Sequence, residues 1–232
     1  MVLAAKRAGV TLMVHENFRW QSAIDKGAIG TPFWGRVSFR STYDVCTGQP
    51  YLSTDDKFII QDLGIHIIDV ARVLFGDVTP LVASTKRVNH RIRAEDVATM
   101  LLVHAGGVTS VVDCSYATRL PHESFPETLL EVDGSEGTLR LSPGYRLTIH
   151  NAAGTEEIDV SPPCPHWAER PWHNIQESVC SIEQHFADCL AERREPETSV
   201  SDNLWTLALV YAAHISAAEG NRAVATGDVA RC

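Results

Sequence analysis

The stretch EDVATMLLVHAGGVTSVVDCSYATR, residues 95–119, decides the fold that we predict for this chain. Its two halves are rich in β-branched residues and alternate in polarity, and AGG at 105–107 separates them. Alternation with a period of two puts every second side chain on one face of a sheet, and a glycine-containing break between two such runs is typical of a hairpin. The stretch therefore predicts two antiparallel strands joined by a tight turn.

Similar β-rich segments, bounded by Gly, Pro, Asn or Asp, lie on both sides of this hairpin. They are FWGRVSFRST (33–42), LVASTKRVNH (81–90), ETLLEVDG (127–134), GTLRLS (137–142) and YRLTIH (145–150). DGSEG at 133–137 predicts a second hairpin turn. We expect one large, mostly antiparallel, open sheet.

Three segments have apolar residues at helical spacing: FIIQDLGIHIIDVARVLFG (58–76), NIQESVCSIEQHFADCLAERR (174–194) and SVSDNLWTLALVYAAHISAAEG (199–220). Gly76 ends the first, and Asp202 is the predicted N-cap of the last. The predicted class is α+β, with helices on one face of the sheet. The other face would be a wide apolar surface, which is a liability in water, so we expect a homodimer or tetramer formed through the open sheet face.

The N-terminal residues follow a different pattern. VLAAKRAG (2–9) predicts a short helix that ends at Gly9, and VTLMV (10–14) predicts a buried strand. A helix that leads into a strand is typical of a parallel sheet, which two elements cannot form alone. We interpret this segment as a βα stub that belongs to another domain.

Bulk composition excludes several classes of function. Among 232 residues, 20 are basic and 29 acidic, which gives a net charge of −9 without a basic stripe. Nucleic acid is therefore not an expected partner. No window approaches the roughly 18 apolar residues that a membrane helix needs, so we expect no membrane association and a cytoplasmic location.

The candidate chemistry lies in QDLGIHIID (61–69). On a helix, Asp62, His66 and Asp69 project from one side, and a carboxylate beside an imidazole can move a proton to or from a substrate hydroxyl. The alternative is structural: Asp62 caps the helix and His66 packs in the core. No third ligand accompanies Asp62 and His66, so we predict no metal site.

Two further regions supply candidate substrate-binding residues. Asn17 and Arg19 follow the predicted strand 10–14, and ligands of open α/β sheets bind beyond the carboxyl ends of strands. Trp172 and His173 lie in a loop rich in aromatic residues, whose planes suit the faces of sugars. Tyr116 is a weaker candidate. In each case ordinary packing is the alternative.

KFIIQDLGIHIIDVARVLFGD (57–77) resembles the D-x-G-x-H-x-x-D signature of the Gfo/Idh/MocA family of oxidoreductases. VTLMVHENFRW (10–20) looks like the last Rossmann strand of that family, and DNLWTLALVYAAHISAAEG (202–220) looks like its closing helix. The resemblance implies that Asp62 and His66 lie in a substrate pocket. It also implies that His66 relays the proton during hydride transfer at a sugar or polyol carbon.

The sequence departs from the family in lacking its G-x-G-x-x-G/A turn, which holds the pyrophosphate, and its Glu-Lys-Pro motif. We therefore expect residues 1–20 to be a remnant of a nucleotide-binding domain and 21–232 to be a substrate-binding and oligomerisation domain. No cofactor is expected to bind to this chain alone. NAD(P) is expected only where a Rossmann domain is supplied, and a separate nucleotide-binding subunit is a possible partner.

Three functions remain open at this level. The first is a truncated oxidoreductase that acts on a sugar, polyol or related hydroxy compound, with redox activity only when a nucleotide-binding domain is supplied. The second is a cofactor-independent acid–base enzyme, such as a lyase, dehydratase, isomerase or cyclase, that uses the same pocket. The third is a non-catalytic partner subunit. Fold alone does not choose between them.

Overall fold

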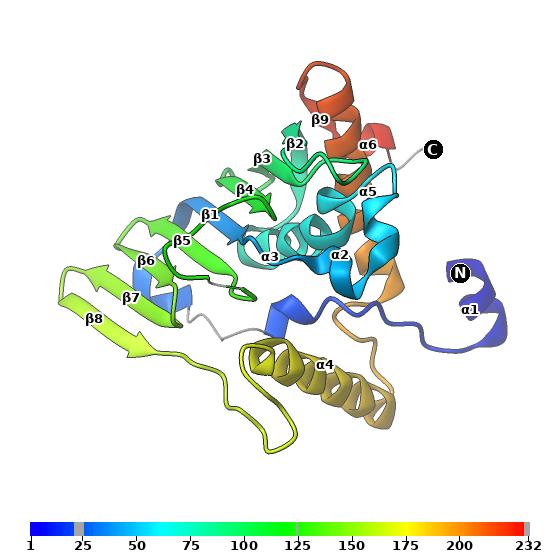
Figure 1. Ribbon diagram of the computed structural model, residues 1–232. Coiled ribbons are helices and arrows are strands. Elements are labelled where there is room, and N and C mark those ends of the chain that lie inside the picture. Colours follow the sequence, from blue (N-terminus) through cyan, green and yellow to red (C-terminus); the bar gives the residue numbers. More distant parts are fainter. Residues whose placement is uncertain (21–25, 124, 230–232) are drawn as a thin grey trace.

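The computed structural model describes residues 1–20, 26–123 and 125–229, and a broad sheet dominates it (Figure 1). In these residues the sheet has nine strands in the order β8-β7-β6-β5-β1-β4-β3-β2-β9. Their bounds are β1 Pro32–Arg40, β2 Val78–Lys86, β3 Val97–His104, β4 Thr109–Ser115, β5 Leu129–Gly134, β6 Gly137–Ser142, β7 Arg146–Asn151, β8 Gly154–Asp159 and β9 Val224–Ala225. β1 and β4 pair in parallel and every other neighbouring pair of strands is antiparallel. The predicted α+β class is confirmed.

Both predicted hairpins are present. β3 and β4 pair across residues 105–108, where Gly107 has a φ of 87°, a backbone conformation that glycine adopts without steric cost. β5 and β6 pair across 135–136. β8 was not predicted, because nearly all of its residues are exposed and its sequence GTEEID shows no apolar alternation.

The long helices are α3 Ile65–Phe75, α4 His173–Glu192 and α5 Val200–Ala218. α3 packs on β1 and β4, and α5 packs on β2, so both cover the same face of the sheet and enclose the core there. α4 lies apart from the sheet and packs on the 3-10 turn η1, Asn17–Trp20. The shorter elements are η2 Lys26–Ile29, α2 Val45–Gly48, η3 Pro50–Ser53, the π-helical turn η4 Ile60–Gly64 and α6 Thr226–Val229.

Two helix-end predictions have different outcomes. Gly76 ends α3 as predicted, with a φ of 89°. The N-cap prediction for α5 is wrong: Ser199 is the cap, and its hydroxyl accepts a hydrogen bond from the backbone N–H of Asp202. A serine hydroxyl serves this purpose as well as a carboxylate does. Asp202 is thereby placed inside the first turn, where its side chain pairs with arginines.

The N-terminal stub forms its helix, α1 Val2–Ala8, with Gly9 as the left-handed cap at φ 64°. The predicted strand 10–14 is wrong: this segment makes a single antiparallel bridge, between Met13 and Ser199. Val14 also donates to the carbonyl of Thr198. Among the described residues no parallel strand lies beside this segment. A strand needs a neighbouring strand to form the hydrogen bonds of its backbone N–H and C=O groups.

The sheet face opposite α3 and α5 is not uniformly apolar, which differs from our expectation. The strand register places Leu101, Val111, Arg36, Glu131 and Arg140 opposite one another in a row across the sheet. Residues directly opposite on paired strands share a face. This face is therefore apolar at Leu101 on β3 and Val111 on β4, and charged over β1, β5 and β6.

Candidate active site

A cavity of about 270 Å³ lies where η1, the helical run from η4 to α3 and the loops after β1 and β4 converge. Its polar lining includes Asn17, Gln49, Asp62 and His66. Its remaining lining is mostly apolar and aromatic: Phe18, Phe39, Tyr43, Val45, Gly48, Leu63, Tyr116, Phe125, Trp172 and Ile175. The fold thus brings five of the sequence-predicted site residues to one cavity, namely Asn17, Asp62, His66, Tyr116 and Trp172.

Asp62 and His66 come from one continuous helical run. Asp62 lies in the π-helical turn η4, and His66 follows in the first turn of α3. Single π-helical turns are frequent at functional sites. Burial raises the pKa of Asp62, and the nearby charge of His66 acts against that rise.

Glu16 contacts the site histidine, and the sequence alone assigned it no role. Its side chain is almost fully buried, and its Oε2 lies 2.6 Å from Nδ1 of His66. Its other oxygen accepts a hydrogen bond of 2.9 Å from Nδ2 of Asn203 on α5. No spacing rule could find this contact, since His66 is 50 residues away along the chain.

The pair changes the ionisation of both groups. Burial by itself raises the pKa of Glu16, but the hydrogen bond and charge of His66 outweigh it and hold that pKa below its usual range. Burial lowers the pKa of His66, but the Glu16 carboxylate outweighs it and raises that pKa. The imidazole is consequently a stronger base than an isolated histidine.

Aromatic rings form one wall of the cavity. The ring of Tyr43 stacks on Phe125 at a centroid distance of 4.0 Å, and Trp172 meets Phe125 edge-on at 4.9 Å. Phe18 stacks on the His66 ring at 4.8 Å. Such faces suit the C–H surfaces of a sugar ring, while the polar residues can fix its hydroxyl groups.

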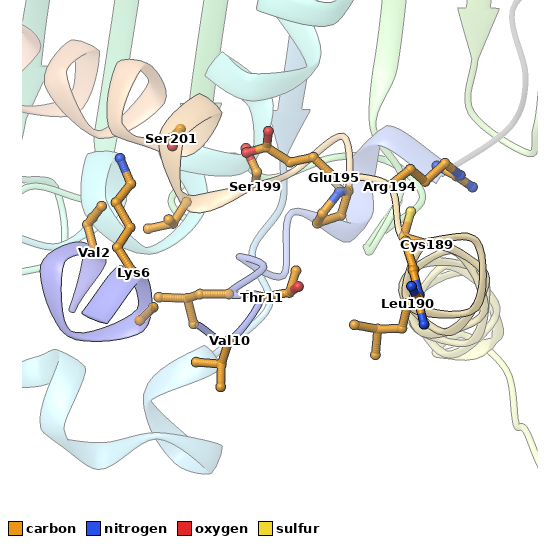
Figure 2. A pocket seen from close by; sticks show the side chains of 15 residues that line it. Val2, Lys6, Val10, Thr11, Cys189, Leu190, Arg194, Glu195, Ser199 and Ser201 are labelled. Carbon is orange, nitrogen blue, oxygen red and sulfur yellow. The ribbon is translucent and has the colours of Figure 1, made fainter. Parts of the chain in front are cut away.

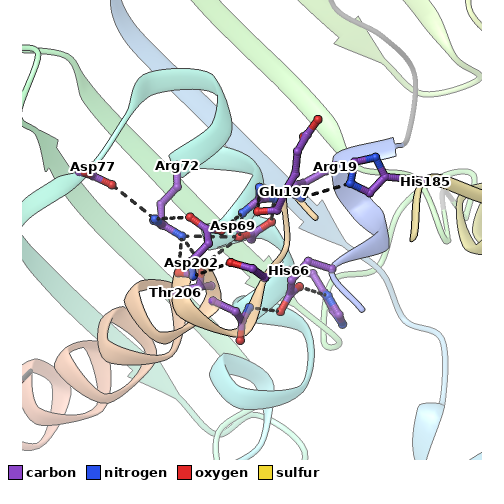
Figure 3. Close-up of polar contacts among 12 residues, drawn as sticks. Arg19, His66, Asp69, Arg72, Asp77, His185, Glu197, Asp202 and Thr206 are labelled. Carbon is purple, nitrogen blue, oxygen red and sulfur yellow. Dashed lines mark hydrogen bonds and ion pairs between the residues drawn. The ribbon is translucent and has the colours of Figure 1, made fainter. Parts of the chain in front are cut away.

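Arg19, a predicted substrate-binding residue, does not line this cavity. Its buried guanidinium pairs with Asp69 through Nε and Nη2 and with Asp202 at 2.6 Å (Figure 3). Asp69 also accepts from the hydroxyl of Thr206 on α5, and Arg72 donates to the same hydroxyl at 2.7 Å. The network links η1, α3 and α5 behind the cavity.

His173 is likewise placed outside the cavity. It is almost fully buried at the start of α4, with Nδ1 at 3.2 Å from the carbonyl oxygen of Pro171. Tyr145 meets its ring edge-on at 5.8 Å. Its neighbour Trp172 occupies the cavity wall instead.

A larger cavity, about 420 Å³, lies between α1, the segment after it and the facing ends of α4 and α5 (Figure 2). None of the sequence-predicted site residues lines it. In the ranges 1–20, 26–123 and 125–229, no cluster of three or more His, Cys, Asp or Glu side chains could hold a metal ion. Within those ranges, no helix combines the length and apolar character needed to cross a bilayer.

Comparison with known proteins identifies the family. The Gfo/Idh/MocA C-terminal domain matches residues 19–140. This chain belongs to the Gfo/Idh/MocA family. The resemblance inferred from QDLGIHIID is therefore confirmed, and the Gfo/Idh/MocA signature is the segment that supplies Asp62 and His66 to the cavity.

Two curated members of the family resemble this chain over most of its length. It is 62% identical to a D-apiose dehydrogenase of Paraburkholderia graminis over 95% of this chain and 60% of the relative. It is 56% identical to a D-apiose dehydrogenase of Rhizobium rhizogenes over 95% of this chain and 66% of the relative. The chain thus spans less than two thirds of the length of either.

A solved structure corrects the cofactor expectation. An oxidoreductase from Agrobacterium radiobacter, crystallised in complex with NAD+, L-tartaric acid and magnesium, matches 98% of this chain at 55% identity with a TM-score of 0.95. The match covers 68% of that protein. The expectation of no cofactor is wrong. It relied on the absence of a glycine-rich turn, which binds the pyrophosphate of a dinucleotide and gives no information about residues near the substrate.

Proposed function

We propose that this Gfo/Idh/MocA chain carries the substrate site of an NAD(P)-dependent dehydrogenase that oxidises a hydroxyl group of a small sugar such as D-apiose. The observation that carries the proposal is the convergence of Asp62 and His66 in a small cavity with aromatic walls. Its volume of about 270 Å³ is near the lower end of the usual ~300–1,000 Å³ for ligand cavities, which favours a single monosaccharide. The two D-apiose dehydrogenases at 62% and 56% identity support the choice of sugar.

Acid–base chemistry in this cavity would fall to His66. As the substrate hydroxyl is oxidised to a carbonyl, its O–H bond breaks and the proton moves to Nε2 of His66, because Nδ1 is engaged by Glu16. Burial raises the pKa of Asp62. Its side chain can accept a hydrogen bond from the sugar and orient the reacting hydroxyl. Tyr43, Phe125 and Trp172 would hold the ring face and exclude water.

The donor set of the cavity fits a nicotinamide reaction. Oxidation of a hydroxyl carbon releases a proton and a hydride, and Asp62 and His66 provide for the proton. NAD(P), when bound, supplies the hydride acceptor. Asn17 and Phe18 line the cavity directly after the segment 10–16, and we propose them as the residues that would border the nicotinamide.

The test uses the 232-residue chain. D-apiose binding is measured by calorimetry, and NADH formation is followed at 340 nm with NAD+ and D-apiose together. We expect His66→Gln to reduce turnover by about 10²–10⁴-fold, the usual contribution of general acid–base catalysis, while sugar binding changes little. Asp62→Asn should weaken both binding and turnover.

The matched control is His150→Gln, which alters an exposed histidine on β7. It should leave binding and turnover unchanged. The proposal is contradicted if the chain does not bind D-apiose. It is also contradicted if His66→Gln and Asp62→Asn both leave binding and turnover unchanged. Conversion of D-apiose without NAD+ would favour the cofactor-independent acid–base alternative instead.

A further inference from the structure

Glu16 is a buried carboxylate outside the family signature, and its surroundings are unusual for a residue with a purely structural role. Only 2% of its surface is exposed. Burial of a carboxylate is costly unless it is paired and hydrogen-bonded. Here the partners are the ring of His66 at 2.6 Å and the amide of Asn203 at 2.9 Å, so one oxygen is fixed by the site histidine and the other by α5.

These contacts determine how the imidazole is held. Phe18 stacks on the ring at 4.8 Å with an interplanar angle of 20°, which restricts its tilt. Glu16 is hydrogen-bonded to Nδ1 of His66. The hydrogen bond made by one ring nitrogen decides which tautomer the neutral ring adopts. Nε2 is thereby left as the nitrogen that can exchange a proton with a molecule in the cavity.

We propose that Glu16 is the positioning residue of this site: it holds His66 with Nδ1–H toward the protein interior and Nε2 toward the substrate, and Asn203 fixes Glu16 in turn. This inference rests on the proposed function for its chemical meaning. As the substrate O–H bond breaks and Nε2–H forms, the ring becomes an imidazolium. The Glu16 carboxylate, already in contact with Nδ1, stabilises that cation without further movement.

The first test concerns the wild-type chain and needs no turnover. Nitrogen and carbon chemical shifts of the histidine rings are followed by NMR as a function of pH, and the His66 signals, among those of ten histidines, are assigned by their loss in His66→Gln. We expect a neutral form protonated at Nδ1 and a pKa above the ordinary histidine value of about 6.5. A neutral ring protonated at Nε2, or an ordinary pKa, would overturn the proposal.

The second test uses Glu16→Gln and Glu16→Asp. In Glu16→Gln the pKa of His66 should fall by at least about one pH unit, since an adjacent opposite charge usually accounts for 1–3 units. The charges of Asp62 and Asp69 also raise this pKa, and both remain in the variant. Because the base must be neutral to accept the proton, the acidic limb of kcat/KM should move to lower pH by the same amount. Glu16→Asp, which keeps the charge, should restore part of the pKa and of the activity.

The matched control is Glu183→Gln. Glu183 also faces a histidine, His15 at 3.6 Å, but both side chains are exposed and lie outside the cavity. It should change neither the pH profile nor the His66 signals. If Glu16→Gln lowers activity evenly at every pH and leaves the His66 pKa in place, Glu16 is structural and the inference fails.

The two proposals fail in distinguishable ways. If D-apiose is not oxidised by any variant but the wild-type NMR shows the Nδ1-protonated ring and Glu16→Gln lowers its pKa, positioning by Glu16 is supported and the proposed function is not. If D-apiose is oxidised and the His66 pKa is indifferent to Glu16, the proposed function survives and positioning by Glu16 is overturned.

Discussion

At the scale of single residues, partners decide what each ionisable group contributes. His66 and His214 are both largely removed from water, yet the pKa of His66 is raised and that of His214 is lowered to about 4. His66 meets the Glu16 carboxylate, which outweighs the effect of burial. Among the described residues no carboxylate acts on His214 in this way: burial lowers its pKa, and the charge of Lys57 lowers it further.

His214 predicts a loss of stability in mild acid. Its Nε2 is buried without a hydrogen-bond partner in the part of the chain that the structure describes. The folded pKa of about 4 lies below the unfolded value of 6.5. Above pH 6.5 the ring is neutral in the folded and the unfolded state, so it does not change the free energy of unfolding. As the pH falls below 6.5 the unfolded chain takes up the proton first, so the free energy of unfolding decreases until about pH 4.

We expect the free energy of unfolding of the wild type to decrease by about 1 kcal/mol between pH 8 and pH 5 because of His214, after allowance for its partial exposure. Urea unfolding at both pH values measures it. His214→Leu should show a smaller loss between pH 8 and pH 5 than the wild type. The exposed His15→Leu is the control and should lose as much as the wild type. Equal losses in His214→Leu and the wild type would contradict the prediction.

At the scale of elements, close packing of α3 on the sheet positions the site. Gly35 on β1 lies directly beneath the ring of Phe75, at the end of α3. A Cβ added at Gly35 would come within 2.1 Å of that ring. The lack of a side chain at Gly35 therefore allows α3 to pack this closely on β1. His66 lies at the other end of α3.

Gly35→Ala should destabilise the fold by about 1–3 kcal/mol, because the added methyl group forces Phe75 or the strand to shift in a close-packed core. Urea unfolding measures the change. Gly106→Ala, in the β3–β4 turn, is the matched control, since an added Cβ meets nothing within 4 Å there. A neutral Gly35→Ala would show that α3 can move away from β1 at little cost.

At the scale of the whole molecule, the sheet face opposite α3 and α5 carries exposed apolar side chains on β3. Leu101 and Val103 on β3 are exposed, with 43% and 37% of their surface accessible. Over β1 and β4, Asp113 instead accepts bonds of 2.7 Å from both Arg36 and Arg40. Apolar and charged regions on one face suit an interface with an apolar centre and a polar border. We propose that this face binds a second copy of the chain.

Light scattering of the purified chain at micromolar concentration should give the mass of a dimer or of a dimer of dimers. Leu101→Glu should shift the mass toward the monomer, because it places a charge in the apolar part of the interface. Val88→Glu, also at an exposed apolar position but beyond the end of β2, should not. A monomeric wild type, or an unchanged mass in Leu101→Glu, would contradict this proposal.

Much of the sheet could be predicted because its signals are local. Alternation in residues 95–119 and glycine-containing breaks identify strands and hairpins from neighbouring residues alone. β8 escaped prediction because it is polar and exposed, and the segment 10–14 was predicted as a strand because apolar composition does not reveal whether a pairing partner is present. Residues 21–25, where we expect the substrate-binding domain to begin, lie outside the described residues.

The sequence by itself determined the α+β class, the helical segment that carries Asp62 and His66, and the family to which the chain belongs. Only the tertiary structure decided which residues share the cavity. It placed Glu16 against His66 and Arg19 in a buried ion-pair network. It also placed His173 outside the cavity. The physical reason is separation along the chain: spacing rules describe one helix or strand, whereas the contacts Glu16–His66 and Arg19–Asp69 join residues 50 positions apart through packing.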